Sequence, residues 1–174
     1  QYVYAGYGGS YNKKLYYSGS IGVEGIWAKA GDADYSYIRP RGSASVTWNI
    51  NGHNSIQLSY SLTNNAPAVS NLNPYNVSTD SLVVAVGNTG LKPQMTNHVS
   101  ANYTLNVGNL YITPEAYYKH IGDMIEPYGY TKDGIYYSTY ANSGHFSQVS
   151  IGANISYRFQ WGRVYGGGGW YADH

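Results

Sequence analysis

The chain of 174 residues lacks cysteine, carries few charges and contains no long apolar run. The absence of cysteine excludes a disulfide scaffold and any zinc site built on thiolates. Ten Lys and Arg against nine Asp and Glu leave no surplus of positive charge to neutralise phosphates, which excludes a typical nucleic-acid-binding module. The longest apolar run, 82–86, is far shorter than the ~20 residues that a membrane helix requires.

A strict alternation of apolar and polar residues is the strongest pattern that is present. Between residues 148 and 160 every second position is apolar, namely Val149, Ile151, Ala153, Ile155, Tyr157 and Phe159. Segments 43–50, 55–62 and 98–107 alternate in the same way. Successive side chains of a strand point to opposite faces, so each segment has one apolar and one polar face. We therefore predict an all-β chain.

The polar positions are mostly Ser, Asn, Gly, Thr and Gln rather than Lys or Glu, and charged residues make up only 11% of the chain. A soluble sheet normally exposes charged side chains, whereas a membrane barrel turns small polar residues inward and apolar ones toward lipid. We therefore expect the apolar row of residues 149–159 to face lipid. A soluble β-sandwich, whose strands alternate equally well, is the alternative.

The lengths of the connections favour the barrel. We expect eight strands, at about 1–11, 15–28, 38–50, 55–63, 95–107, 109–122, 142–160 and 162–172. Short connections then alternate with longer ones, which span 31–37, 64–94 and 123–141. This arrangement is typical of an up-and-down antiparallel membrane barrel with short periplasmic turns and long outer loops. The loops around Tyr35, Asn71 and Tyr130 should then lie outside the cell.

The longest predicted loop carries a local signature. It contains Ser-Leu-Thr-Asn-Asn-Ala-Pro from Ser61, then Leu72-Asn73-Pro74-Tyr75, then Gly87-Asn88-Thr89-Gly90-Leu91-Lys92-Pro93-Gln94. In order and spacing these motifs resemble the barrel of TonB-dependent outer-membrane receptors, in particular the Bacteroidetes outer-membrane β-barrel family. Thr89-Gly90 and Gln94 depart from the usual Pro and Glu of that family. We therefore do not assign the substrate of any relative to this chain.

The resemblance implies a bacterial outer-membrane barrel of 22 strands with an N-terminal plug, which takes up large nutrients with energy from the inner membrane. Residues 1–174 would form a single barrel segment without that plug. The remainder of the barrel and the plug are the partners that the resemblance implies. An open sheet in lipid would leave unpaired backbone groups at both edges, so either further strands exist or these eight close on themselves.

No chemistry-bearing cluster is visible in the sequence. The five histidines, His53, His98, His120, His145 and His174, show no metal-ligand spacing. No Ser/His/Asp grouping can be assembled, and Gly166–Gly169 lacks the Lys-Ser/Thr and the helix of a phosphate loop. We therefore expect no enzyme activity, no metal and no cofactor.

Tyrosines in the predicted outer loops are the best candidates for ligand contact, because a phenol offers a flat apolar ring and a hydroxyl. The candidates are Tyr75, Tyr128, Tyr130, Tyr136 and Tyr137. They suit a small-molecule or oligosaccharide ligand, such as a glycan or siderophore, taken up by an outer-membrane receptor. Packing within a hairpin is the competing role. The alternative functions are a small eight-stranded barrel with an adhesive or structural role, and a soluble carbohydrate-binding sandwich.

Overall fold

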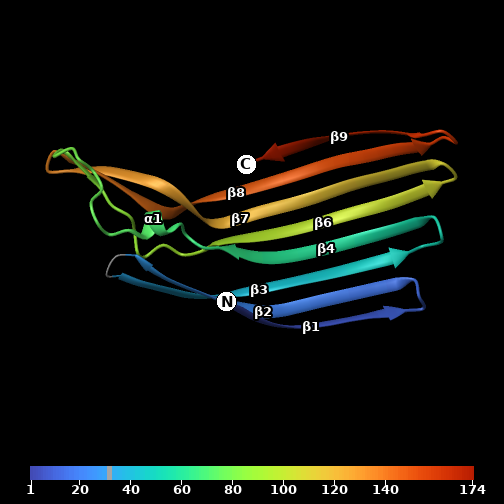
Figure 1. The fold of residues 1–174 in the computed structure, drawn as a ribbon, viewed down its shortest axis with the longest axis horizontal. Coiled ribbons are helices and arrows are strands. Elements are labelled where there is room, and N and C mark those ends of the chain that lie inside the picture. Colours follow the sequence, from blue (N-terminus) through green and yellow to red (C-terminus); the bar gives the residue numbers. More distant parts are fainter. Residues whose placement is uncertain (31–32) are drawn as a thin grey trace.

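The computed structural model describes residues 1–30 and 33–174 as one curved sheet (Figure 1). The elements are β1 (Tyr2–Tyr11), β2 (Leu15–Ala30), β3 (Ala33–Asn49), β4 (Asn54–Asn65), α1 (Val69–Leu72), β5 (Val83–Ala85), β6 (Gln94–Val107), β7 (Leu110–Lys132), β8 (Ile135–Arg158) and β9 (Arg163–Asp173). Within these residues no helix is long and apolar enough to cross a membrane.

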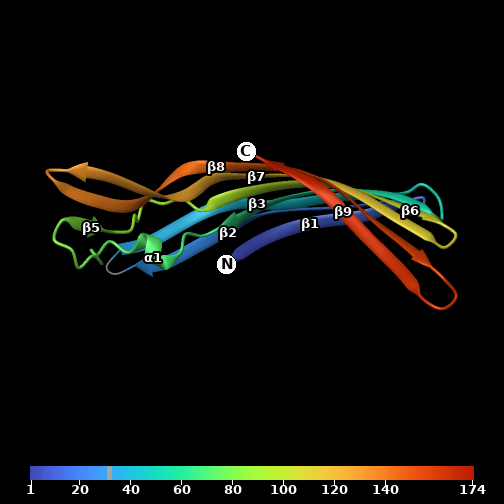
Figure 2. The same ribbon diagram turned by 90° about the horizontal axis from the view of Figure 1, so that it is seen from above.

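The eight long strands pair antiparallel with their neighbours in chain order, from β1 through β4, then β6 to β9. The up-and-down all-β prediction is thereby confirmed. The short strand β5 pairs parallel with β8 from Val83 to Ala85. It was not predicted, because a segment of three residues is too short to show an alternation of apolar and polar residues. Among the described residues β1 and β9 have one neighbour each, so the sheet is open. The two strands lie at its opposite edges in Figure 1, and Figure 2 shows the curve of the sheet from above.

Four tight turns lie at one end of the sheet, which we call the short-turn end. They join β1 to β2, β3 to β4, β6 to β7 and β8 to β9. Asn12 and Lys13 have φ of 52° and 53°, and Gly108 has φ of 60°. Positive φ in such short turns matches the right-handed twist of the strands that they join.

Two of the predicted long loops are instead continuations of strands. The expected loop 31–37 is mostly β3, which pairs with β2 up to Ala30 and Ala33; residues 31–32 lie outside the described residues. The expected loop 123–141 is a hairpin in which β7 runs to Lys132 and β8 starts at Ile135. A register irregularity between Ile121 and Ile125 interrupts the alternation there and hides the strand from sequence reasoning.

The two faces of the sheet differ as the alternation predicts. On the polar face, serine hydroxyls meet across strands: Ser18 and Ser45 at 2.8 Å, Ser20 and Ser43 at 2.9 Å, and Ser59 and Ser100 at 2.7 Å. The apolar face carries the row of residues 149–159, of which Ile151 is 56% and Ile155 49% exposed. Such exposure of large aliphatic side chains is expected of a surface that lipid covers.

Polar side chains mark one limit of the apolar face. The Tyr60 hydroxyl donates to Asn97 Oδ1 at 2.8 Å, and His120 Nδ1 lies 2.9 Å from Ser147 Oγ. From Ser147 to Tyr157 the strand rises roughly 33 Å at ~3.3 Å per residue. With a tilt of about 40° this spans about 25 Å, which is the height of the apolar band of outer-membrane barrels.

The buried core is small and lies at the opposite end from the tight turns, which we call the hairpin end. Its members are Tyr35, Leu72 and Leu91, which are 5%, 0% and 1% exposed. Ile26, Ala28, Tyr37, Ile125 and Tyr140 pack around them. The core therefore forms where loop 66–93 folds back against the ends of β2, β3, β7 and β8.

Candidate functional site

Loop 66–93 is held against the sheet by its own backbone. The Gly87 N–H donates to the Asn73 carbonyl at 2.6 Å, and the Asn88 N–H donates to the Asn71 carbonyl at 2.7 Å. A Cβ at Gly87 would lie 2.5 Å from both the Asn71 oxygen and the Asn73 nitrogen. Glycine is therefore required at this close approach of two backbones.

Two asparagines fasten the loop to β8. The Asn142 amide accepts from the Lys92 N–H at 2.7 Å and donates to the Lys92 and Asp123 carbonyls at 3.0 and 2.7 Å. Asn88 donates to the Tyr140 carbonyl at 2.9 Å and accepts from the Gly90 N–H at 2.9 Å. No local sequence pattern indicates this role of Asn142, because Lys92 lies 50 residues away in the chain.

The motifs around Leu72 and Gly87 are thus explained structurally. Leu72 and Leu91 supply the core, while Asn73, Gly87 and Asn88 supply the backbone clamp. These contacts hold loop 66–93 in a fixed position beside the sheet.

Charged side chains surround this region. Arg39 Nη2 donates to Asp123 Oδ2 at 3.0 Å, which links β3 to β7, and its guanidinium carbon lies 4.9 Å from the centre of the Tyr37 ring. Arg41 Nη1 lies 3.4 Å from Glu24 Oε2. Because Arg39 is only 18% exposed, its ion pair is less screened than an ordinary surface pair.

Tyr35 lies within the core, and its hydroxyl has no hydrogen-bond partner among the described residues. Burial raises the pKa of Tyr35 to about 12, the neighbouring Tyr37 adds to the rise, and Arg39 opposes it. The neutral phenol is therefore the form that the hairpin end accommodates.

The structure brings three of the five candidate tyrosines together. The Tyr130 and Tyr137 rings stack with centroids 5.0 Å apart and planes 5° apart, and Tyr128 lies 5.9 Å from Tyr130. We call these three side chains the tyrosine strip. The strip lies on the opposite face of the hairpin from Tyr140, which packs against the core.

The other two candidates are placed elsewhere. Tyr136 is on the reverse face of the hairpin, where its ring covers the backbone of Gly129. An aromatic ring over a strand glycine shields the backbone, which is a packing role. Tyr75 lies in loop 66–93 and is half exposed, and its N–H donates to Asn73 Oδ1 at 3.1 Å.

The described residues contain no group of three or more side chains suited to hold a metal ion.

Comparison with known proteins gives one family and several similar structures. The family model described as "Outer membrane protein beta-barrel family" matches residues 28–172. No curated protein matched the chain by sequence.

Among solved structures, the FrpB iron transporter from Neisseria meningitidis (F3-3 variant) is similar, with a TM-score of 0.76, 14% identity, and coverage of 99% of this chain and 25% of that chain. The copper transporter OprC has a TM-score of 0.68 at 10% identity, covering 99% of this chain and 29% of that chain. The outer membrane transporter YddB from Escherichia coli has a TM-score of 0.60 at 13% identity, covering 89% and 24%. These likenesses show the fold, and this chain spans about a quarter of the length of those proteins.

Proposed function

The chain belongs to the outer membrane protein beta-barrel family and lies in the bacterial outer membrane, and from this we propose that it forms part of the wall of a larger uptake receptor. The open sheet is the observation that carries the proposal. In lipid, each unpaired N–H or C=O along β1 and β9 would cost several kcal/mol. Further strands that pair with both edges remove that cost.

The fixed loop supports the same proposal. Loop 66–93 is clamped by Gly87, Asn88 and Asn142 against the ends of four strands. In our proposal this end faces the outside of the cell, and the loop shapes the entrance to the barrel. The plug and the coupling to an energy source, which the resemblance to TonB-dependent receptors implies, belong to the complete receptor.

The tyrosine strip is the surface that we assign to the solute. The reverse face of the hairpin is already occupied, by Tyr136 over Gly129 and by Tyr140 in the core. Tyr128 and Tyr130 remain 51% and 43% exposed. A sugar ring or an aromatic siderophore can stack on such phenol faces. We propose binding and transfer of an unmodified solute, with no catalytic step.

A two-sheet sandwich does not fit the part of the chain that the structure describes, because all nine strands there belong to one sheet. Disulfide mapping of the complete protein distinguishes a small barrel closed by these eight strands from a wall segment of a larger barrel. Because this segment contains no cysteine, introduced cysteines can be paired without interference from it. We expect no disulfide between Ala5→Cys in β1 and Gly166→Cys, Gly168→Cys or Ala172→Cys in β9, since disulfides need Cα atoms within about 7 Å. A disulfide between these two strands in the native membrane would show that eight strands close alone, and would overturn the proposal.

Solute contact is tested with the complete protein in lipid nanodiscs, using maltohexaose and ferric enterobactin as probes. We expect one of them to bind, and Tyr130→Ala to weaken that binding about tenfold or more. Thr131→Ala, on the reverse face of the same hairpin, is the matched control and should leave the affinity unchanged. Failure of both probes to bind, or equal losses in the two variants, would contradict the assignment of the strip.

A further inference from the structure

Positive charge gathers at the short-turn end of the polar face. Lys13 and Lys14 lie in the first turn, and Arg158 and Arg163 flank the last. None of the residues in the four short turns, 12–14, 50–53, 108–109 and 159–162, is Asp or Glu. The acidic residue Glu115 in β7 is four residues from Tyr111. At ~3.3 Å per residue it lies about 13 Å along the strand from Tyr111 and so away from the turns.

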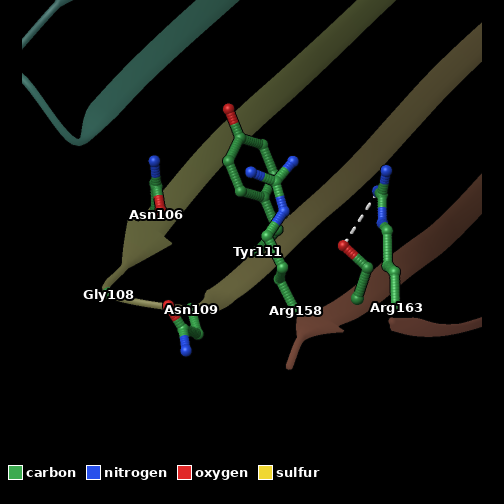
Figure 3. A pocket seen from close by; sticks show the side chains of 7 residues that line it. Asn106, Gly108, Asn109, Tyr111, Arg158 and Arg163 are labelled. Carbon is green, nitrogen blue, oxygen red and sulfur yellow. Dashed lines mark hydrogen bonds between the residues drawn. The ribbon is translucent and has the colours of Figure 1, made fainter. Parts of the chain in front are cut away.

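These cations line a continuous groove. A cavity of about 380 Å³ is lined by Asn106, Gly108, Asn109, Tyr111, Ser156, Arg158 and Arg163. A second cavity, of about 460 Å³, is lined by Lys13, Lys14, His53 and their polar neighbours. Asn106 and Tyr111 line both cavities, so the two adjoin. Figure 3 shows Tyr111, Arg158 and Arg163 extending in the same direction from their strands.

The charges in the groove are left without anionic partners. Arg158 and Arg163 are directly opposite each other across β8 and β9, and like charges in that position repel. Arg163 Nη2 donates to the neutral Ser156 hydroxyl at 3.0 Å. Within residues 1–30 and 33–174, the side chains of Lys13, Lys14 and Arg158 form no ion pair. A bound anion would relieve this repulsion.

The position and length of the groove indicate the kind of anion. Tyr111 and Ser156 belong to the polar face and alternate with Leu110, Ile112, Ile155 and Tyr157, so the groove faces away from lipid and its anionic headgroups. From β2 to β8 the groove crosses five strand spacings, or about 24 Å at ~4.8 Å each. An extended polypeptide covers that distance with about eight residues, and several carboxylates can then meet several cations.

We propose that this groove binds an extended acidic polypeptide segment at the short-turn end of the barrel wall. The segment lies across the strand ends, with its Asp or Glu side chains directed at Lys13, Lys14, Arg158 and Arg163. The amides of Asn106 and Asn109 and the hydroxyl of Tyr111 provide further hydrogen bonds along its path.

The test places a benzophenone photo-crosslinking residue at Tyr111 in the complete protein, in its native outer membrane. Tyr111 is exposed and lines both cavities, and the benzophenone side chain resembles tyrosine in shape. We expect a crosslink to a polypeptide segment, identified by mass spectrometry, in which about one residue in three or more is Asp or Glu. The same crosslinker at Val107, on the apolar face of the same end, should react with lipid.

Charge is tested in the crosslinking protein itself. Neutralising Lys13, Lys14, Arg158 and Arg163 to Gln should lower the crosslink yield at least fivefold. Neutralising Lys29 and Lys132 at the hairpin end is the matched control and should not. In the unaltered protein, raising NaCl from 0.05 to 0.5 M should lower the yield in the same way, which keeps the test valid if the fourfold variant misfolds.

Several results would overturn the proposal. A crosslink from Tyr111 to lipid, or to a segment without acidic residues, would do so. The absence of any crosslink would do so too, as would a crosslink yield that changes neither with NaCl nor with the fourfold neutralisation. None of these results depends on whether β1 and β9 pair with further strands or on solute binding, so the acidic-segment proposal and the receptor proposal can fail separately.

Discussion

At the scale of single residues, the hairpin end depends on side chains whose contacts leave little room for change. Gly87 lies where two backbone segments meet, and Asn142 satisfies three backbone groups at once. Each bond is worth about 1 kcal/mol net, but an unsatisfied buried partner costs more. Loop 66–93 is thus fastened by a few residues rather than by a broad apolar interface.

Gly87→Ala should loosen this loop. Its Cβ would meet backbone atoms of Asn71 and Asn73 at 2.5 Å, and backbone cannot move aside as a flexible side chain can. We expect a cost of about 1–3 kcal/mol, seen as faster proteolysis within 66–93 while the rest of the sheet stays resistant. Gly52→Ala, whose Cβ would meet nothing within 4 Å, is the control. Equal cleavage rates in the two variants would contradict the clamp.

The raised pKa of Tyr35, which lies at the hairpin end outside the apolar band, predicts that the stability of the fold depends on pH. Its folded pKa of about 12 exceeds the unfolded value of about 10, so the folded state holds the proton more tightly. The resulting stability is fully present below pH 10 and is lost as the pH rises toward 12.

Tyr35→Phe should remove that dependence and change little at neutral pH, since the hydroxyl has no partner among the described residues. The measurement is thermal unfolding of the complete protein in detergent at pH 8, 10 and 11, with Tyr130→Phe as control. A loss of stability that is the same in Tyr35→Phe and in the unaltered protein would show that other groups cause it.

At the scale of elements, the two faces of β8 should respond differently to charge. Ile151→Arg and Ile155→Arg place a guanidinium within the apolar band, where we expect a cost of about 2–4 kcal/mol. Ser150→Arg and Asn154→Arg, on the polar face of the same strand, should cost much less. Equilibrium unfolding of the complete protein in lipid vesicles measures the difference. Equal costs on both faces would contradict the assignment of the row to lipid.

Much of the strand pattern could be predicted because alternation is a local property. The limits of β4, β6 and β9 lie within about two residues of those expected from sequence. The hairpin-end parts of β7 and β8, residues 123–132 and 135–141, were not predicted as strand. The irregularity between Ile121 and Ile125 shifts the alternation of apolar and polar residues out of phase there. Asp133 and Gly134, with φ of 52° and 76°, form the turn of this hairpin, and they are an Asp-Gly signal that sequence reasoning passed over.

The candidate site was predictable only in part, for a different reason. The density of tyrosines in 128–137 is visible in the sequence, but the face on which each lies depends on the register between β7 and β8. Tyr130 pairs with Tyr137, whereas Tyr136 pairs with Thr131 and turns to the other side. The partners of Asn142 and the groove between the first and last turns are set by contacts between distant segments. No local pattern reports such contacts.

At the scale of the whole molecule, the turn charges and the longest extensions of the chain, loop 66–93 and the β7–β8 hairpin, define the same direction along the strands. The short-turn end carries Lys13, Lys14, Arg158 and Arg163 and no acidic residue in its turns. The hairpin end carries both signs, with Asp34, Asp80, Asp123, Glu126 and Asp133 beside Lys29, Arg39, Lys92 and Lys132. Outer-membrane barrels place short turns in the periplasm and longer connections outside. On that rule we propose that the basic groove faces the periplasm and that loop 66–93 faces the surroundings of the cell.

This orientation predicts which sites a membrane-impermeant reagent can reach. Cysteines introduced singly at Asp80 and Lys132 should react with a maleimide–polyethylene glycol reagent on intact cells, because both residues are exposed at the hairpin end. A cysteine at Gly52, where a side chain meets open space, should react only after the outer membrane is permeabilised. All three variants should react fully in detergent, which controls for local accessibility. Labelling of Gly52→Cys but not Lys132→Cys on intact cells would reverse the orientation, and with it the compartment from which the acidic segment approaches the groove.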